Sequence, residues 1–307
     1  MMQQLISEQL IAELEEAQIG RVRVNEPLAK YTTWDIGGPA DLFLIPDTEE
    51  QLSRALALLN RHSVPWCVLG RGSNTLVSDR GVRGAVIKLG DGFDEVQFDG
   101  NTVTAGASYS FIKLSVVVGK EGLTGLEFAG GIPGTVGGAV YMNAGAHHSD
   151  ISRILQSADI IWEDGSRSVL GNEEMSFSYR HSILHEKRGI VVRAAFKLQS
   201  GDRKEIAAAM ASYKDRRRRT QPLQMACAGS VFRNPPGDYA ARLIEAAGLK
   251  GLREGAAEVS QVHANFIVNH GGARAEDVLT LMSRVQAIIE QQTGIKLVPE
   301  VLLMGER

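Results

Sequence analysis

Apolar residues recur at helical spacing in three parts of the chain, and each part is predicted to form an amphipathic helix. The first helix begins after Asp47, where Thr48 and Gln51 have the spacing of a capping box. Its apolar face is formed by Leu52, Ala55, Leu56 and Leu59. The second covers residues 203–219, with an apolar stripe of Ile206, Met210 and Tyr213. The third covers residues 275–293 and ends at Gly294. Its inward face is formed by Val278, Leu281, Met282, Val285 and Ile288.

Short strands are predicted between the first two helices. The apolar run VPWCVLG, residues 64–70, follows the first helix and indicates a buried strand in a βαβ-type step. The alternating stretch EVQFDGNTVTAGA carries Asp99-Gly100-Asn101 at its centre, which is a hairpin signal. Near Gly201 the pattern changes from strand-rich to helix-rich. We therefore predict an α+β protein with a larger domain over residues 1–200, in two parts of about 1–65 and 66–200, and a smaller α+β domain over 201–307.

Composition and charge exclude several classes of protein. Hydrophobic residues make up 44% of the chain and charged residues 22%, which is ordinary for a globular protein. The formal net charge of −3 argues against general electrostatic binding to nucleic acid. The uncharged run 128–149 could cross a bilayer by length, but its glycines, proline and histidines argue against that. The N-terminal stretch MMQQLISEQLIAELEEAQ lacks the features of a signal peptide. We expect a cytoplasmic monomer without membrane insertion.

Metal and disulfide chemistry are not predicted. Cys67 and Cys227 are far apart and have no metal-like spacing, so they are expected to be buried, reduced thiols. His147 and His148 are adjacent, and adjacent side chains rarely converge on one ion. We expect no metal site.

Two glycine-rich segments are the first candidates for ligand binding. The stretch GRGSN, residues 70–74, follows the predicted strand, and FAGGIPGTVGGAVYMNAGA, residues 128–146, has six glycines in nineteen residues. Glycines in a turn after a strand can expose successive backbone N–H groups to a phosphate. The first stretch lacks the third glycine of the dinucleotide fingerprint, because Thr75 stands there. Taken alone, GRGSN is as typical of an ordinary turn as of a pyrophosphate loop.

The combination of the two segments resembles the FAD-binding domain of flavoproteins related to vanillyl-alcohol oxidase, the PCMH type. More narrowly, the chain resembles the family of UDP-N-acetylenolpyruvoylglucosamine reductases. The motifs that carry this resemblance cover nearly the whole chain in order, and they are YTTWDIGGPAD, SFSYR, AGSVFRNP, AARLIEAAGLKG, VSQVHANFIVN and LVPEV. After NAGA the family commonly has Tyr-Gly, whereas this chain has His147-His148. The short spacing from Arg180 to Ser230 resembles the compact form of the enzyme.

The resemblance implies non-covalent FAD, with NADPH as the hydride donor and a UDP-sugar as the substrate. The implied reaction reduces UDP-N-acetyl-3-O-enolpyruvylglucosamine to UDP-N-acetylmuramate in peptidoglycan precursor synthesis. The residues implied to contact FAD are Gly70, Arg71, Gly72, Ser73, Asn74, Thr75, Ala129, Gly131, Pro133, Gly134, Gly137, Gly138, Asn143 and Gly145.

The resemblance also implies three catalytic residues, Arg180, Ser230 and Glu300. In SFSYR, a strand would place Ser178 and Arg180 on one face, although an arginine there is more often a solvated edge residue. Most serines in a loop such as AGSVFRNP have no chemical role. In LVPEVLLM, a strand would place Glu300 on an apolar face, where a carboxylate is costly unless it is neutral or paired. An inward charge that protects a sheet edge is the alternative for Glu300.

Four further residues are predicted to bind the substrate. The resemblance implies Tyr179, Asn234 and His263, whereas Arg218 is chosen from the run KDRRRR at the end of the second helix. A solvated helix end is the alternative for that run, because cations favour helix C-termini. Two other functions remain open: a related FAD-dependent oxidase that acts on another substrate, and a non-enzymatic FAD-binding module.

Overall fold

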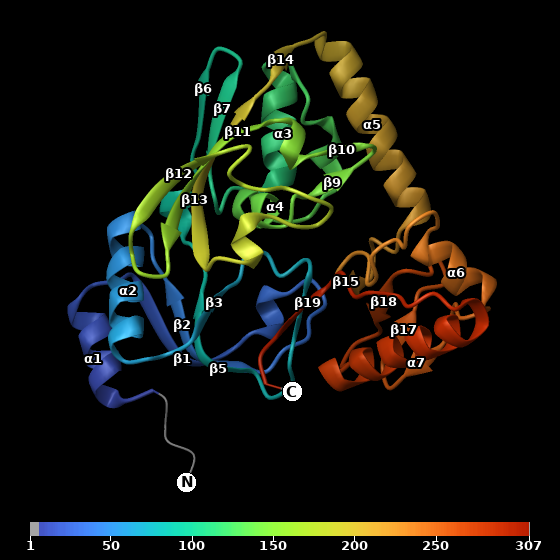
Figure 1. Cartoon of the computed structure of the whole chain (residues 1–307), viewed down its shortest axis with the longest axis horizontal. Helices are drawn as coiled ribbons and strands as arrows, with labels where there is room; N and C mark the ends of the chain where they lie inside the picture. Colours follow the sequence, from blue (N-terminus) through green and yellow to red (C-terminus); the bar gives the residue numbers. More distant parts are fainter. Residues whose placement is uncertain (1–5, 307) are drawn as a thin grey trace. The chain divides into compact units, whose positions relative to one another are not determined.

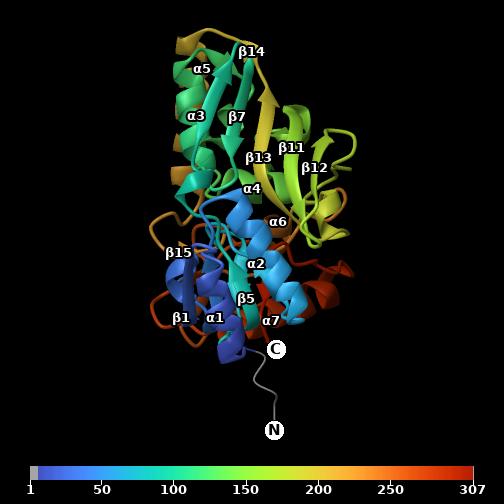
Figure 2. The same cartoon turned by 90° about the vertical axis from the view of Figure 1, so that its left-hand side faces the viewer.

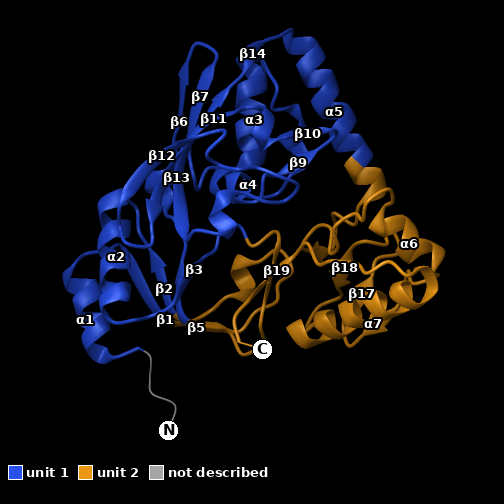
Figure 3. Ribbon diagram, in the orientation of Figure 1, with its two compact units in different colours: residues 1–24, 42–71, 84–216 blue, residues 25–41, 72–83, 217–307 orange. Residues whose placement is uncertain are grey.

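The computed structural model describes residues 6–306, which divide into two compact units (Figure 3). Unit 1 contains the described residues up to 24, together with 42–71 and 84–216. Unit 2 contains 25–41, 72–83 and the chain from 217 onward. We predicted one boundary near Gly201, whereas the chain passes between the units five times. The predicted domain limits, 1–200 and 201–307, remain a proposal about domains rather than a description of these units.

Both units contain α-helices and strands, and several strands follow one another with no α-helix between them, which confirms the α+β class. The α-helices of the described residues are α1 Glu8–Glu16, α2 Glu49–Arg61, α3 Phe111–Lys120, α4 Val136–Tyr141, α5 Arg203–Thr220, α6 Ala240–Ala246 and α7 Ala275–Thr293 (Figure 1). None of these helices is long and apolar enough to cross a membrane.

The three helices predicted from apolar spacing are confirmed as α2, α5 and α7. Thr48 caps α2 by accepting the N–H of Gln51 at 3.2 Å. Gly294 ends α7 with a φ of +71°. In the last turns of α7, Ile288 is partly buried against the core of unit 2, as predicted, and Ile289, which the prediction omitted, is fully buried. The inward positions follow the true helical period of 3.6 residues from Val278.

The strands are short, as predicted. They are β1 Arg21–Pro27, β2 Pro39–Ile45, β3 Trp66–Val68, β4 Thr75–Val77, β5 Val82–Ile87, β6 Val96–Asp99, β7 Thr102–Gly106, β8 Leu123–Thr124, β9 Gly145–Ala146, β10 Ser149–Asp150, β11 Leu155–Trp162, β12 Arg167–Gly171, β13 Gly189–Lys197, β14 Gln199–Ser200, β15 Ala226–Cys227, β16 Arg253–Glu254, β17 Ala257–Val259, β18 Ile267–Asn269 and β19 Leu302–Met304.

A five-stranded antiparallel sheet in the order β12-β11-β13-β7-β6 lies in unit 1 (Figure 2). The predicted hairpin joins β6 to β7, with Asp99 opposite Thr102 and Gly100 at a φ of +55°. The side chains that pack α3 and α4 into the same core as β13 include Phe111, Leu114, Val136, Val140 and Phe196. This core supports the glycine-rich segment that leads into α4.

The order of strands in a second sheet is β1-β2-β5-β3. Helix α2 connects β2 to β3, and β3 pairs with β5 in parallel, with Trp66 opposite Ala85. The predicted helix-to-strand step is therefore confirmed, although the strand is shorter than the apolar run. The core beneath α1 and α2 includes Leu10, Leu14, Leu52, Leu56 and Trp66.

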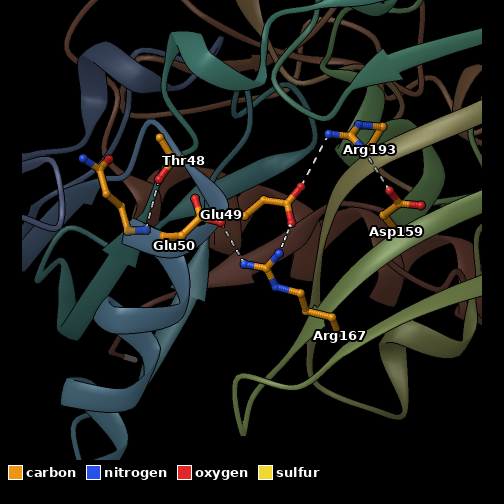
Figure 4. A network of polar contacts seen from close by, with 7 residues as sticks. Thr48, Glu49, Glu50, Asp159, Arg167 and Arg193 are labelled. Carbon is orange, nitrogen blue, oxygen red and sulfur yellow. Dashed lines mark hydrogen bonds and ion pairs between the residues drawn. The ribbon is translucent and has the colours of Figure 1, made fainter.

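The first turn of α2 is tied to the five-stranded sheet by an ion-pair network (Figure 4). Glu49 contacts Arg167 at 2.8 Å and Arg193 at 3.5 Å, and Arg193 also contacts Asp159 at 3.3 Å. Glu50 contacts Arg167 at 3.5 Å. Carboxylates at a helix N-terminus interact favourably with the helix dipole, so both glutamates stabilise the start of α2 as well as the ion pairs.

Unit 2 has its own core around Trp34 of the YTTWDIGGPAD motif. The Trp34 indole donates to Ile267 O at 2.8 Å, and Asn269 Nδ2 donates to Trp34 O at 2.8 Å. Trp34 is fully buried in the cluster that includes Phe232, Leu243 and Val278. These contacts explain why residues 25–41 belong to the same compact unit as the C-terminal part of the chain.

Helix α7 is capped by a residue that lies far away in sequence. Asp79 accepts the N–H of Ala275 at 2.8 Å through Oδ1 and the N–H of Glu276 at 3.0 Å through Oδ2. A carboxylate at this position satisfies two of the four unpaired N–H groups of the helix and interacts favourably with its dipole.

Replacing Asp79 by alanine is expected to lower the free energy of unfolding by about 1–2 kcal/mol, because the cap and the dipole interaction are both lost. Urea unfolding followed by circular dichroism measures this change. Asp79→Asn keeps one acceptor and is expected to lose less. Equal losses in the two variants would show that the cap contributes little.

Candidate active site

The loop Gly70–Asn74, which includes the predicted site residue Ser73, links β3 to β4. The predicted site residue Thr75 is buried at the start of β4. Within the described residues, the backbone N–H groups of Gly70, Arg71, Gly72 and Asn74 have no hydrogen-bond acceptor. Successive unpaired N–H groups in a turn form an anion-binding concavity. The loop therefore has the donors that the predicted pyrophosphate site requires.

Lys88 is a cation beside this loop that the sequence reasoning missed. Its Nζ donates to Gly70 O at 3.1 Å. Burial lowers the pKa of Lys88, the nearby charge of Arg71 lowers it further, and Asp91 acts in the opposite direction. Lys88 directly follows the apolar strand β5, which pairs in parallel with β3. Ligands bind at the carboxyl ends of parallel strands, so this position in the sequence could have indicated a ligand contact.

Gly72 and Gly137 lie where the backbone packs closely against other protein atoms. A Cβ on Gly72 would lie 2.4 Å from Tyr31 O, and the φ of Gly72 is +64°. A Cβ on Gly137 would lie 3.0 Å from the Cβ of Ala107. The implied contacts of these two glycines with FAD stay a prediction, but a side chain at either position would meet protein atoms first. Gly138 differs, because its nearest neighbour would be Thr135 Oγ1 at 3.5 Å.

Alanine is expected to have opposite effects at these positions. Gly72→Ala should destabilise the fold by about 1–3 kcal/mol, because both the positive φ and the contact with Tyr31 O oppose a side chain. Gly138→Ala should be neutral or should stabilise by up to about 1 kcal/mol, because alanine is the better helix former. Thermal unfolding of the two apoproteins measures the difference. A large destabilisation in Gly138→Ala would contradict the geometry.

The second glycine-rich segment forms the turn that begins α4. Thr135 caps this helix by accepting the N–H of Gly138 at 3.3 Å. In the described part of the chain, the N–H groups of Gly134 and Thr135 have no acceptor. Of the other predicted contacts, Ala129 is buried in the core, and Gly131 and Pro133 lie between it and the turn. This segment offers backbone donors and no charged side chain.

His147 and His148 form the turn of the hairpin β9–β10, which also contains Gly145. Both histidines have a positive φ, +54° and +65°, and Ala146 pairs with Ser149 across the turn. Two central residues with positive φ define a type I′ turn, for which glycine is favoured. The His147 ring stacks on Tyr213 of α5 with centroids 3.8 Å apart. The histidine pair is therefore a structural turn.

Arg180 lies in a tight turn and not in the strand that we predicted for SFSYR. Ser178 and His181 form an isolated bridge, and Arg180 has a φ of +56°. The Arg180 guanidinium donates to Gly145 O at 3.1 Å and lies over the ring of the half-exposed Tyr179. The turn thus places Arg180 against the end of the glycine-rich segment within unit 1.

Asn143, a predicted FAD contact, stabilises this turn. Its Nδ2 donates to Ser178 O at 3.0 Å, and its Oδ1 accepts the N–H of Ser152 at 3.0 Å. The side chain is only 4% exposed. Each polar end of the side chain bonds protein, and the implied contact of Asn143 with FAD stays a prediction.

Ser230 and Glu300 lie on neighbouring segments of unit 2. Glu300 N donates to Val231 O at 2.7 Å, so Glu300 is bonded to the residue that follows Ser230. Asn74 Nδ2 donates to Glu300 O at 3.2 Å, which ties the end of the GRGSN loop to Glu300. The Ser230 hydroxyl makes no hydrogen bond to any described residue. The two predicted catalytic residues are therefore brought together by backbone pairing.

The strand predicted for LVPEVLLM was partly wrong. Only Leu302–Met304 form a strand, β19, which pairs in parallel with β4. Pro299 makes an isolated bridge to Phe232, and Val298 is 53% exposed. Glu300 therefore stands before the strand and is half-buried.

Asn234 and His263 have polar atoms that remain available. Asn234 is exposed, and its Oδ1 accepts the N–H of Ala240 at 3.1 Å, which leaves its Nδ2 donors without an acceptor among residues 6–306. His263 Nδ1 accepts the N–H of Asn265 at 3.2 Å, which places the proton of the neutral ring on Nε2. Burial lowers the pKa of His263, and Lys250 lowers it further, so the neutral ring is favoured near pH 7.

Arg217, and not Arg218, is the distinctive arginine of the run at the end of α5. Arg218 is exposed, whereas Arg217 is partly buried, and its Nε donates to Gln221 Oε1 at 2.9 Å. Burial lowers the pKa of Arg217, and Cys227 acts in the opposite direction. No carboxylate pairs with it in the described chain. Helix rotation decides which arginine turns inward, and charge counting in the sequence could not show this.

No group of three or more His, Cys, Asp or Glu side chains among residues 6–306 could hold a metal ion. Cys67 and Cys227 are both free thiols. Burial raises the pKa of Cys67 to about 12, so this thiol is not a nucleophile at neutral pH.

Comparison with known proteins assigns both parts of the chain. Residues 40–171 match the FAD binding domain family, and residues 221–304 match the UDP-N-acetylenolpyruvoylglucosamine reductase, C-terminal domain family. The UDP-N-acetylenolpyruvoylglucosamine reductase of Anoxybacillus flavithermus is 53% identical over 98% of this chain and 100% of its own length. The crystal structure of the reductase from Thermus caldophilus has a TM-score of 0.80 at 39% identity, over 92% of this chain and 98% of its own.

A more distant structure shows the fold alone. A variant of the grass-pollen protein Phl p 4, a glucose oxidase, has a TM-score of 0.51 at 16% identity over 64% of this chain and 45% of its own.

The family matches show that the chain is a flavoprotein of the FAD-binding-domain class, with an α+β fold. It belongs to the UDP-N-acetylenolpyruvoylglucosamine reductase family.

The residues of both glycine-rich segments fit FAD. A dianionic diphosphate needs backbone donors without intervening side chains, and both the loop Gly70–Asn74 and the turn at Gly134–Thr135 supply them. The cations Arg71 and Lys88, both in unit 1, complement the negative charge of this diphosphate. The chemistry of the donors agrees with the cofactor that the family binds.

Proposed function

We propose that this protein reduces UDP-N-acetyl-3-O-enolpyruvylglucosamine to UDP-N-acetylmuramate with NADPH, using FAD. The observation that carries the proposal is the 53% identity to a reductase of this name over 98% of this chain and 100% of the relative. The bonded pair formed by Val231 and Glu300, which places Ser230 beside Glu300 in unit 2, supports the same reaction.

Bound FAD supplies hydride chemistry, and the residues of the chain supply placement, charge and a proton. Addition of a hydride to the terminal vinyl carbon leaves an electron pair on the α-carbon beside a carboxylate. The Arg180 guanidinium and a hydrogen bond from the Glu300 carboxyl group stabilise this enolate-like dianion. The proton that completes the lactyl ether comes from the Ser230 hydroxyl, which no described residue engages as a donor or acceptor.

A serine is a weak acid, but the α-carbanion beside a carboxylate is basic enough to accept its proton. Ser230 follows Gly229, whose φ of +72° turns the chain there. A proton from solvent then restores the serine. In this scheme Arg180, Ser230 and Glu300 are the catalytic residues.

The substrate contacts follow from the groups that remain available. We assign the diphosphate to Arg217, because it is partly buried and has no carboxylate partner, in place of our choice of Arg218. Asn234 Nδ2 and His263 Nε2–H are donors for the sugar nucleotide, and Tyr179 lies beside Arg180 for the enolpyruvyl group. The same nucleotide chemistry would serve NADPH.

Location and assembly are further proposals. The free thiols Cys67 and Cys227 are consistent with a reducing compartment, which supports the cytoplasm. The monomeric state remains a prediction from the sequence.

Steady-state turnover tests the proposed function. The purified protein with NADPH and the enolpyruvyl nucleotide should consume both in equal amounts and give a product heavier by two hydrogen atoms. A related oxidase would instead consume oxygen and form peroxide, and a binding module would consume nothing.

A further inference from the structure

The segment that carries Ser230 is held on both sides within unit 2. On one side, Arg233 N donates to Val298 O at 2.8 Å and Glu300 N donates to Val231 O at 2.7 Å. On the other side, Asn265 supplies the hydrogen bonds to Val231 and Phe232. The position of the Ser230 hydroxyl relative to Glu300 therefore depends on both sets of bonds.

Asn265 makes three hydrogen bonds to this segment. Its Nδ2 donates to Phe232 O at 2.8 Å, and its Oδ1 accepts the N–H of Phe232 at 3.0 Å. Its backbone O accepts the N–H of Val231 at 2.9 Å. The side-chain amide thus replaces the backbone of a neighbouring strand, at a site where Asn265 is only 3% exposed.

This geometry has a definite physical consequence. A buried amide whose two ends bond the N–H and the C=O of one residue fixes that residue in translation and in rotation. Removal of the amide leaves both groups of Phe232 unpaired in a buried site, so the segment must shift to find other partners. Since Ser230 is two residues away, its hydroxyl moves with the segment.

We propose that Asn265 is a positioning residue for the proton donor, acting through Phe232 and Val231 to hold the Ser230 hydroxyl beside Glu300. The proposal rests on the proposed function. It assigns the Asn265 side chain a role in the proton step and none in the reaction with NADPH, because both bonds of its amide go to Phe232 in the segment that carries Ser230.

Asn269 provides a matched control. It is also a buried asparagine of unit 2, 6% exposed, whose Nδ2 donates to Trp34 O and whose Oδ1 accepts the N–H groups of Gly271 and Ala273. Its loss should cost stability in the same way, but none of its side-chain bonds reaches the Ser230 segment.

The experiment compares Asn265→Ala and Asn269→Ala as FAD-loaded proteins in stopped-flow absorbance. In Asn265→Ala, reoxidation by the enolpyruvyl nucleotide should slow 10-fold to 100-fold, while bleaching by NADPH changes less than 3-fold. In Asn269→Ala both phases should change less than 3-fold, although both variants lose thermal stability. Similar slowing of reoxidation in both variants, or slowing of both phases in Asn265→Ala, would overturn the proposal.

Two readouts separate positioning from a general loss of structure. In the apoprotein, hydrogen–deuterium exchange of the peptide over 230–234 should be faster in Asn265→Ala than in Asn269→Ala. Asn265→Asp should regain the reoxidation rate as the pH is lowered, because a protonated carboxyl again donates to Phe232 O. Unchanged exchange in the 230–234 peptide would contradict the proposal. If the wild-type protein does not turn over the nucleotide at all, the proposed function fails instead, and the exchange result still decides whether Asn265 holds the segment.

Discussion

Replacing Ser230 by alanine is expected to slow reoxidation by the enolpyruvyl nucleotide by three orders of magnitude or more. This corresponds to about 4 kcal/mol or more of lost transition-state stabilisation. The reason is that the α-carbanion must be protonated, and the Ser230 hydroxyl is the proposed proton donor. Reaction with NADPH builds no enolate and needs no proton from Ser230, so bleaching of the protein should be nearly unchanged.

Stopped-flow absorbance of the two half-reactions measures both rates separately. Ser230→Cys is the control, since a thiol keeps a transferable proton in nearly the same space, and it should retain more of the reoxidation rate than alanine. Equal slowing of both half-reactions in Ser230→Ala would mean that the serine maintains the structure of the site.

Replacing Glu300 by alanine is expected to slow the same half-reaction by a factor of about 100 or more, because a hydrogen-bond donor to the developing dianion is lost. The backbone of Glu300 should remain in place, because its N–H and C=O are bonded to Val231 and Asn74. The side chain can therefore be changed without dismantling the segment.

Glu300→Gln distinguishes two roles of the carboxyl group. If Glu300 acts as a neutral donor, glutamine keeps a donor and should be at least 10-fold faster than alanine. If its proton is transferred, the two variants should be equally slow. Rates of reoxidation at several pH values, with NADPH reduction as the internal reference, measure the difference.

The helices were predictable because their signals are local. The apolar stripes of α2 and α7 and the cap at Thr48 depend on residues within a few turns, and all were confirmed. The carboxylate that caps α7 could not be foreseen, because Asp79 and Ala275 are far apart in the sequence. Tertiary contacts of this kind have no periodic signal.

The errors around the candidate site have physical causes. Alternation in SFSYR suggested a strand, but Arg180 and Ser176 have a positive φ, and no pattern of side chains reveals that. In LVPEV, Val298 and Glu300 bond the segment around Phe232, and pairing with β4 begins only at Leu302. Gly72 and Gly137 were assigned to a ligand, although protein atoms lie in the space beside them. A glycine in a sequence can indicate that other atoms lie close to its Cα, but it does not show whether those atoms belong to the protein or to a ligand.

An anaerobic titration tests the central claim most directly. The purified yellow protein is mixed with NADPH in the absence of oxygen, and the enolpyruvyl nucleotide is added after the flavin absorbance has been bleached. We expect that one equivalent of the nucleotide restores the absorbance and that UDP-N-acetylmuramate is formed in the same amount. Bleaching that only oxygen reverses, with the nucleotide left unchanged, would contradict it.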